Sequence, residues 1–160
     1  RKFGRFYLYN SINFLDTRLG IEPLAKNFNE NWLIKNLNNR NRQIKQLLLD
    51  QSFIVGLGNI YTDEALWKSK IHPLSKSDNI NTFKVKTLYK AIKNVLNESI
   101  KQGGTTIRDY TYDFSYVGNY ALNLNVYGRN NQPCNRCNNT LIKIRVAQRG
   151  THICSKCQIL

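Results

Sequence analysis

The chain has 160 residues, which is enough for one domain or for a small domain with an appendage. Its apolar fraction of 41% argues against global disorder, and the absence of a run of about 18 apolar residues argues against a transmembrane span. The formal net charge of +14 makes nucleic acid the leading candidate partner, although a solvated lysine-rich surface would give the same composition.

The first part of the chain predicts one strand and two short helices. Residues 3–9 are rich in aromatic side chains and are typical of a strand, and residues 12–28 are expected to be a connecting segment. Asn29 or Asn31 can cap a helix that carries Trp32, and a second helix is expected over residues 41–50.

The middle of the chain predicts two further helices and a loop. Two glycines precede Asn59, a capping asparagine, and the helix that follows should end before His72 and Pro73. A long amphipathic helix should begin at Asn81 or Thr82 and end at Gly103 and Gly104. Residues 105–125 are polar, aromatic and poorly periodic, so we expect a long loop there.

The end of the chain predicts a metal site. All four cysteines lie there in two C-x-x-C pairs separated by 16 residues, and tetrahedral zinc is the ion that such pairs favour: Cys134, Cys137, Cys154 and Cys157. One structural Zn²⁺ is expected, because two disulfides would need an oxidising compartment and no signal for export is present. A zinc ribbon that only stabilises a small fold is an open alternative.

The metal-binding segment is also strongly basic. Residues 126–160 contain six basic side chains and no acid, so with four thiolates and one zinc ion the segment keeps a charge of about +4. The spacer between the cysteine pairs has room for a β-hairpin, whose tip we expect at residues 148–150. An arginine at that tip, Arg149, could reach into a polyanion.

The G-x-G-N turn is a weak signal by itself. Glycines allow a backbone to approach a ligand closely, and the helix that follows offers free N–H groups to a phosphate, but a plain helix–turn–helix connection would use the same residues. Lys45, fourteen residues before Asn59, would ordinarily be a solvated lysine.

Taken together, these residues resemble a known family, formamidopyrimidine-DNA glycosylase. The run from Leu48 to Trp67 resembles the helix–two-turn–helix motif of that family, and residues 71–73 and 103–109 resemble the segments that follow it. Val126-Tyr-Gly-Arg, Pro133-Cys134 and Val146-Ala-Gln-Arg-Gly-Thr-His resemble its C-terminal zinc finger. The similarity runs in the same order along nearly the whole chain.

The resemblance implies a fold and three domains. We expect a mainly α helix–two-turn–helix domain at residues 19–125, with a loop over the lesion, followed by a small β-hairpin zinc finger at residues 126–160. Residues 1–18 would be the last strand of a missing N-terminal β-sandwich with its linker.

The resemblance also implies roles for individual residues. Lys45, Asn59 and Arg149 would hold DNA phosphates around the lesion. Arg1 would pair with the orphaned cytosine and Phe3 would wedge into the stack, because an everted base leaves a void that must be filled. Residues 110–118 would cover the everted base, but their match is loose and indicates no single recognition residue.

The catalytic residues of that family are not matched in this sequence. The family uses the amine of an N-terminal proline, with a neighbouring glutamate, to excise the base and cut the strand by β- and δ-elimination. This chain begins with Arg1, has no Pro-Glu pair at its start and contains no methionine, so we expect it to be part of a longer protein. By itself the chain should bind damaged DNA or nothing, and it should not cleave.

The expected parent is a bacterial repair enzyme, a DNA glycosylase and AP lyase that removes oxidised purines such as 8-oxoguanine and formamidopyrimidines. We expect it to be a cytoplasmic, nucleoid-associated monomer that binds duplex DNA and no membrane. The alternatives are an endonuclease VIII-like glycosylase for oxidised pyrimidines, a non-catalytic zinc-ribbon protein that binds nucleic acid, and a purely structural zinc module in a ribosomal or transcription assembly.

Overall fold

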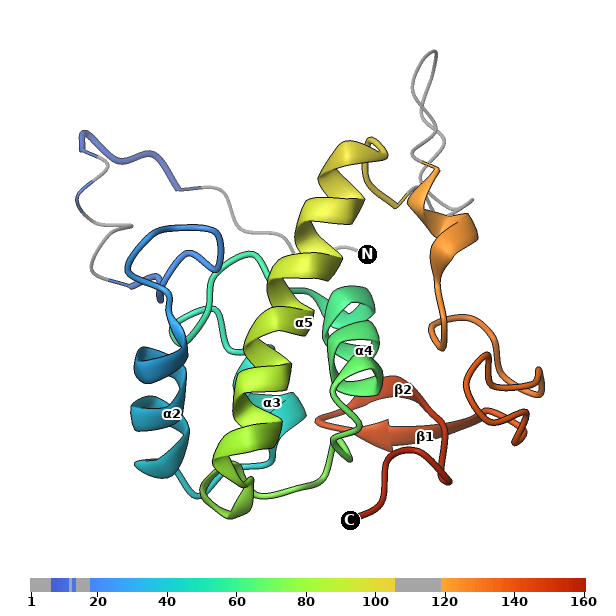
Figure 1. The fold of residues 1–160 in the computed structure, drawn as a ribbon. Coiled ribbons are helices and arrows are strands. Elements are labelled where there is room, and N and C mark those ends of the chain that lie inside the picture. Colours follow the sequence, from blue (N-terminus) through green and yellow to red (C-terminus); the bar gives the residue numbers. More distant parts are fainter. Residues whose placement is uncertain (1–6, 12, 14–17, 106–118) are drawn as a thin grey trace.

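The computed structural model describes residues 7–11, 13, 18–105 and 119–160. Among these residues four helices come first: α2 (Glu30–Asn38), α3 (Ile44–Leu48), α4 (Asn59–Lys68) and α5 (Thr82–Lys101), with the 3₁₀ turn η1 (Ser77–Asn79) before the last of them. A second 3₁₀ turn, η3 (Tyr120–Asn123), precedes a hairpin of β1 (Ile142–Val146) and β2 (Arg149–Ile153). The helices pack together, and the hairpin lies against one end of the bundle, beside α4 (Figure 1).

Side-chain caps fix the starts of two helices where the sequence predicts them. Asn29 accepts a hydrogen bond from the backbone N–H of Trp32, and Asn81 accepts one from Lys84. Each asparagine therefore satisfies a donor that the first turn of a helix leaves unpaired. Helix α5 ends before Gly103 and Gly104, which both have positive φ, as predicted.

Helix α3 is shorter than the predicted span of residues 41–50. The backbone N–H groups of Ile44 and Lys45 donate to the carbonyls of Ser75 and Pro73, which lie far along the chain. Because these carbonyls satisfy the first free donors, the helix begins at Ile44 and is fixed against the segment before η1.

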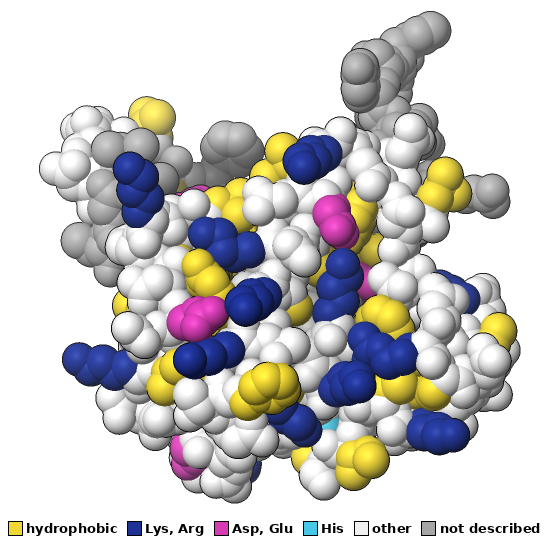
Figure 2. All heavy atoms as spheres, viewed as in Figure 1, with side chains coloured by type: hydrophobic (Ala, Val, Ile, Leu, Met, Phe, Trp, Pro, Cys, Tyr) yellow, Lys and Arg dark blue, Asp and Glu magenta, His cyan; other side chains and the backbone are white. Residues whose placement is uncertain are grey.

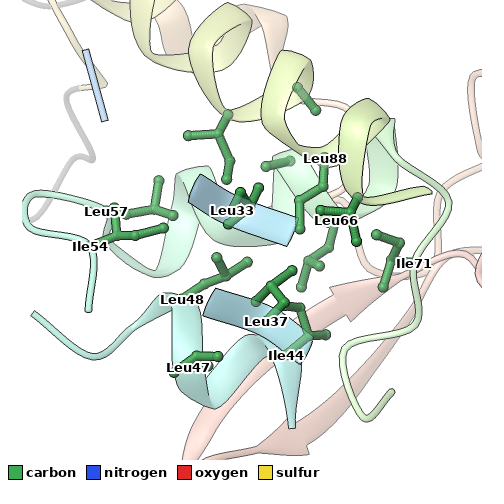
Figure 3. Packing of buried hydrophobic residues seen from close by; sticks show 14 of the residues in the cluster. Leu33, Leu37, Ile44, Leu47, Leu48, Ile54, Leu57, Leu66, Ile71 and Leu88 are labelled. Atoms are coloured by element: carbon green, nitrogen blue, oxygen red, sulfur yellow. The ribbon is translucent and has the colours of Figure 1, made fainter. Parts of the chain in front are cut away.

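The main core lies between the helices. Figure 3 shows leucine and isoleucine side chains from α2, α3, α4 and α5 and their connections packed into one cluster. Leu33, Leu37, Ile44 and Leu66 are among its fully or almost fully buried members. A second, smaller cluster joins the hairpin region to α4 and comprises Trp67, Val126, Cys134, Leu141 and Cys154. No helix among the described residues is long and apolar enough to cross a membrane.

The hairpin tip differs from the prediction. Strands β1 and β2 are antiparallel, with Val146 opposite Arg149, so the two-residue turn is Ala147 and Gln148. Both turn residues have positive φ, which tight hairpin turns require. Arg149 is therefore the first residue of β2 and stands beside the turn instead of at its apex.

Two other predictions need correction or completion. Tyr7, Leu8 and Tyr9, the described part of the strand expected at residues 3–9, are not in a strand. A strand needs a neighbour for its backbone hydrogen bonds, and the hairpin is the sheet that the described residues form. The loop expected at residues 105–125 contains the turn η3, while residues 106–118 lie outside the described part of the chain.

Candidate metal centre and nucleic-acid interface

The four cysteines form one cluster, as the sequence predicts. Their sulfur atoms all lie within 4.8 Å of one another, and the Cys137 sulfur is 3.5 Å from those of Cys154 and Cys157. A zinc ion with Zn–S bonds of about 2.3 Å needs sulfurs about 3.8 Å apart at the corners of a tetrahedron. The donor set and its spacing therefore fit one Zn²⁺.

The electrostatics of the cluster are consistent with a bound cation. Burial raises the pKa of the Cys157 thiol to about 12, and hydrogen bonds with Cys137 and Cys154 add to this effect. Burial also acts to raise the pKa of Cys134, but hydrogen bonds, first among them one from the backbone N–H of Arg136, outweigh it and bring that pKa to about 6. Four neighbouring sulfurs become thiolates together only when a metal ion balances their charge.

A buried glutamate attaches the start of the zinc-binding segment to the helical domain. The Glu64 carboxylate is fully buried on α4 and accepts hydrogen bonds from the backbone N–H groups of Asn125, Val126 and Tyr127, at 2.8 to 3.0 Å. The Asn125 side chain donates a further bond at 3.1 Å. Three consecutive N–H groups aimed at one carboxylate fix the direction in which the chain enters the finger.

Two further contacts dock the body of the finger. The Arg136 guanidinium stacks over the Trp67 ring at 3.9 Å and donates to the Trp67 carbonyl at the end of α4. The buried Gln158 side chain donates to the carbonyl of Ile71 and accepts from the N–H of Cys154. The metal cluster therefore has a fixed position relative to the C-terminal end of α4.

The glycine turn leaves the N-terminal end of α4 open. Gly56 has a φ of +80°, and its N–H donates to the Gln51 side chain, which in turn donates to the carbonyl of Leu57. Gly58 is the N-cap residue and has no side chain to cap the helix, and the space where a Cβ would stand is empty. Among the described residues, no side chain caps the first N–H groups of α4, which suits an anion.

Asn59 is the first residue of α4, not its cap as the sequence suggests. Its side-chain amide donates to the carbonyl of Gly150 at 3.0 Å, which links the start of α4 to the hairpin. The other atom of the amide, Oδ1, is buried and has no partner among the described residues. The second amide hydrogen of Asn59 has no acceptor among the described residues.

Lys45 is completely buried, whereas the sequence favours a solvated lysine. Its ammonium lies 2.5 Å from Oδ1 of Asp63 and 2.7 Å from the hydroxyl of Thr151. Burial lowers the pKa of Lys45 even though the Asp63 carboxylate acts in the opposite direction. The lysine is thus held inside the junction between α3, α4 and β2.

Arg149 is exposed on the same junction. It lines a hollow of about 310 Å³ between α3 and the hairpin turn, and Arg42 lies on the other side of this hollow. Arg42 forms an ion pair with Asp50 at 2.8 Å, whereas Arg149 has no ion pair with any described residue and supplies the uncompensated charge there. The structure therefore brings Lys45, Asn59 and Arg149 together around one short stretch of β2.

The other residues named from the sequence cannot be placed. Arg1 and Phe3 lie outside the described residues, as do residues 110–118. Sequence reasoning missed Asp63 and Glu64, whose only local signal is that two adjacent acids occupy a helix with an apolar face. Figure 2 shows that lysine and arginine side chains are spread over the face of the molecule that carries α5, with few acids among them.

A helical domain with an open glycine turn, followed by a four-cysteine hairpin, is the architecture of the H2TH class of DNA-repair glycosylases. The family model described as "Formamidopyrimidine-DNA glycosylase H2TH domain" matches residues 19–111, and the one described as "Zinc finger found in FPG and IleRS" matches residues 131–159. The chain belongs to the formamidopyrimidine-DNA glycosylase family.

Curated relatives support this assignment over the whole chain. The formamidopyrimidine-DNA glycosylase of Enterococcus faecalis is 44% identical over 168 residues, and that of Bacillus subtilis is 41% identical over 162 residues. These alignments cover 100% and 99% of this chain. The chain spans only 59% of the length of either relative.

Solved structures agree with the fold. A complex of a Lactococcus lactis FPG mutant with Fapy-dG-containing DNA has a TM-score of 0.86 and 38% identity, covering 92% of this chain and 54% of that one. The Thermus thermophilus MutM (FPG) protein has a TM-score of 0.85 and 37% identity, covering 94% of this chain and 57% of that one. The mainly helical domain followed by a hairpin zinc finger is thus confirmed.

Proposed function

We propose that this chain is the damaged-DNA-binding part of a DNA-formamidopyrimidine glycosylase and AP lyase. Its substrate is duplex DNA that contains an oxidised purine or an abasic site. The observation that carries the proposal is the bond from Asn59, at the open N-terminal end of α4, to the carbonyl of Gly150, which directly follows the exposed Arg149 in the hairpin. Similar proteins of known structure are complexes with Fapy-dG-containing and abasic-site DNA.

The chemistry of this junction suits a phosphate. Free N–H groups at a helix start and one amide hydrogen of Asn59 are donors without charge, and the positive end of the helix dipole adds to them. The Arg149 guanidinium can bind two oxygens of the same or the next phosphate. These donors could hold the backbone on either side of an everted nucleotide while reading no base.

Lys45 lies at the same interface, but the Asp63 carboxylate compensates its charge. Its ammonium already binds Asp63 and Thr151, so a direct contact with a phosphate would require the side chain to leave this pocket. In the proposed complex a phosphate lies near the carbonyl of Gly150, which Lys45 and Asn59 both approach. Arg1 and Phe3 would fill the void left by the everted base.

The cutting chemistry belongs to the longer parent protein in this proposal. In the family the nucleophile is an N-terminal proline amine, and the three prolines of this sequence, Pro23, Pro73 and Pro133, are all internal. The 160 residues alone would therefore bind damaged DNA and leave it intact. The parent would excise the oxidised purine and cleave the strand by β- and δ-elimination.

The preferred lesion separates this proposal from an endonuclease VIII-like enzyme. The parent enzyme should excise 8-oxoguanine faster than thymine glycol from otherwise identical duplexes. Faster excision of thymine glycol would move the protein to the oxidised-pyrimidine branch, without affecting the proposed phosphate site.

Replacing Arg149 by alanine tests the proposed interface. We expect the affinity for a duplex with a tetrahydrofuran abasic site to fall roughly 10- to 100-fold, because a charge-assisted hydrogen bond contributes about 1.5–3 kcal/mol. The slope of log K against log salt should become less steep by about 0.9, the value for one phosphate. Fluorescence anisotropy over a salt series measures both quantities.

Arg145→Ala is the matched control. Arg145 lies in the other strand of the same hairpin, opposite Gly150, so alternation directs its side chain to the other face. The Arg145→Ala substitution removes the same charge as Arg149→Ala, but it should change the slope of log K against log salt much less than Arg149→Ala does. Equal effects of the two substitutions would reduce the role of Arg149 to general basicity, and an unchanged slope for Arg149→Ala would remove it from the interface.

The proposed setting is the cytoplasm of a bacterium, where a monomer acts on DNA of the nucleoid. Bacterial relatives and four cysteines kept as thiol ligands support a reducing compartment. Sedimentation of the protein with and without a single-lesion duplex would test the one-to-one stoichiometry.

A further inference from the structure

Three consecutive residues that follow Arg149 in β2 are each held by a side chain from the helical domain. The carbonyl of Gly150 accepts from Asn59 at 3.0 Å, and the hydroxyl of Thr151 accepts from Lys45 at 2.7 Å. The N–H of His152 donates to Oδ2 of Asp63 at 2.9 Å. The helical domain therefore fixes the backbone of β2 directly after Arg149.

These contacts form one connected network that ends at Arg149. One carboxylate oxygen of Asp63 binds Lys45 and the other binds β2. Lys45 donates to Thr151, whose hydroxyl donates in turn to the carbonyl of Arg149 at 3.1 Å. The side chains of Lys45 and Asp63 are 0% exposed, and Thr151 is 0% exposed as a residue, so water cannot readily replace any of these bonds.

Further contacts outside this network also dock the finger. Glu64 holds the entry of the finger, and the stacking of Arg136 on Trp67, together with Gln158, holds the body around the cysteines. A buried ion pair adds little net stability, because removing two charges from water costs free energy. Apolar side chains of similar volume often stabilise the fold as much or more. Buried charges are better suited to fixing one geometry. Here they fix the position of Arg149, whose guanidinium is the exposed cation.

We propose that Asp63, Lys45 and Thr151 are a positioning unit that sets Arg149 relative to the open N-terminal end of α4. The unit makes the distance between the guanidinium and the helix N–H groups a property of the helical domain, not of the zinc cluster. This inference rests on the proposed function, because it concerns the geometry with which Arg149 meets a phosphate.

Thr151→Val tests the unit with little change of shape. The substitution deletes the hydroxyl that joins Lys45 to the Arg149 carbonyl. The affinity for abasic-site duplex should fall about tenfold, within the range of coupling between neighbouring groups. In the Arg149→Ala background the same substitution should change the affinity by less than about twofold, because no guanidinium remains to be positioned.

Two matched variants separate positioning from packing. Thr62→Val makes the same change at a buried threonine of α4 whose hydroxyl has no partner among the described residues, and it should leave DNA binding unchanged. Thr151→Ser keeps the hydroxyl and removes the methyl group, and it should bind DNA as the unsubstituted protein does. Zinc content should stay at one ion per chain in every variant.

The possible results distinguish a failure of the positioning role from a failure of the proposed phosphate site. Equal losses from Thr151→Val in the unsubstituted protein and in the Arg149→Ala background, or a loss in Thr151→Ser as large as in Thr151→Val, would overturn the positioning role. An unchanged affinity of Thr151→Val while Arg149→Ala binds weakly would overturn this inference and leave the proposed function standing. If Arg149→Ala itself has no effect, the proposed phosphate site fails and the inference fails with it.

Discussion

Replacing Glu64 by glutamine should separate the zinc finger from the helical domain. In the native protein one carboxylate oxygen accepts from the N–H groups of residues 125–127, and the other accepts from the N–H and side chain of Asn125. An amide has one acceptor atom, so its NH₂ group would face two donors at 2.9 and 3.1 Å. Losing two charge-assisted bonds at about 1.5–3 kcal/mol each predicts a destabilisation of roughly 3–6 kcal/mol.

The two tryptophans allow the change to be located. Trp67 belongs to the cluster shared by the finger and α4, whereas Trp32 packs against the core of the helical domain. In a Trp32→Phe background, the fluorescence of Trp67 reports urea unfolding at the docking surface of the finger. The midpoint measured by fluorescence should fall steeply in Glu64→Gln, while far-UV circular dichroism still shows the helices unfolding at higher urea.

Glu98→Gln is the control for the loss of one negative charge. Glu98 lies on α5, pairs with Lys68 at 3.2 Å and is 48% exposed, and exposed pairs of this kind contribute roughly 0–1 kcal/mol. If Glu64→Gln shifts the Trp67 transition by no more than Glu98→Gln does, the carboxylate is not what holds the finger.

Two other perturbations have expected results. Stoichiometric removal of zinc by a chelator should unfold the hairpin and abolish binding to abasic-site DNA, because metal binding supplies the folding free energy of so small a unit; binding that survives removal would separate the hairpin from the interface. Acidification should act through His72, whose pKa burial lowers below 6.5 and whose Nδ1 accepts the N–H of Leu74. The native state binds this proton less readily than the unfolded chain, so the contribution of His72 to stability is present above about pH 6.5 and is lost as pH falls through the lower native value. Denaturant titrations of His72→Asn should show a shallower decrease of the unfolding free energy across that window than the unsubstituted protein, and equal slopes would contradict the assignment.

The sequence predicts those elements whose positions are determined by residues close to them in the chain. Asn29 and Asn81 cap helices because a short polar side chain can satisfy a donor three residues ahead, and this is visible in the sequence. The cysteine spacing likewise contains the metal site within 24 residues. Helix α3 could not be delimited in this way, because its start depends on the carbonyls of Pro73 and Ser75.

The site was less accessible to sequence reasoning, because its decisive contacts are long-range. Lys45 meets Asp63 across 18 positions and Thr151 across 106, so no window of sequence shows that this lysine is buried. The position of Arg149 depends on the register of the hairpin. The observed turn at residues 147 and 148 begins one residue before the expected tip at residues 148–150, and this changes which residue stands at the apex.

Helix α4 gives a physical reason why the helical part of the chain and the zinc finger stay together in one domain. Its N-terminal end presents N–H groups that no described side chain caps, its second turn supplies two buried carboxylates, and its last turn supplies Trp67. Asp63 holds the strand that bears Arg149, and Glu64 holds the chain that enters the finger. Because the anion-binding end and both carboxylates that hold the finger lie on one helix of 10 residues, the hairpin cannot move away from α4 without breaking buried bonds to charged groups. The positive groups at the junction therefore keep a fixed spacing before DNA arrives, which reduces the ordering cost of binding.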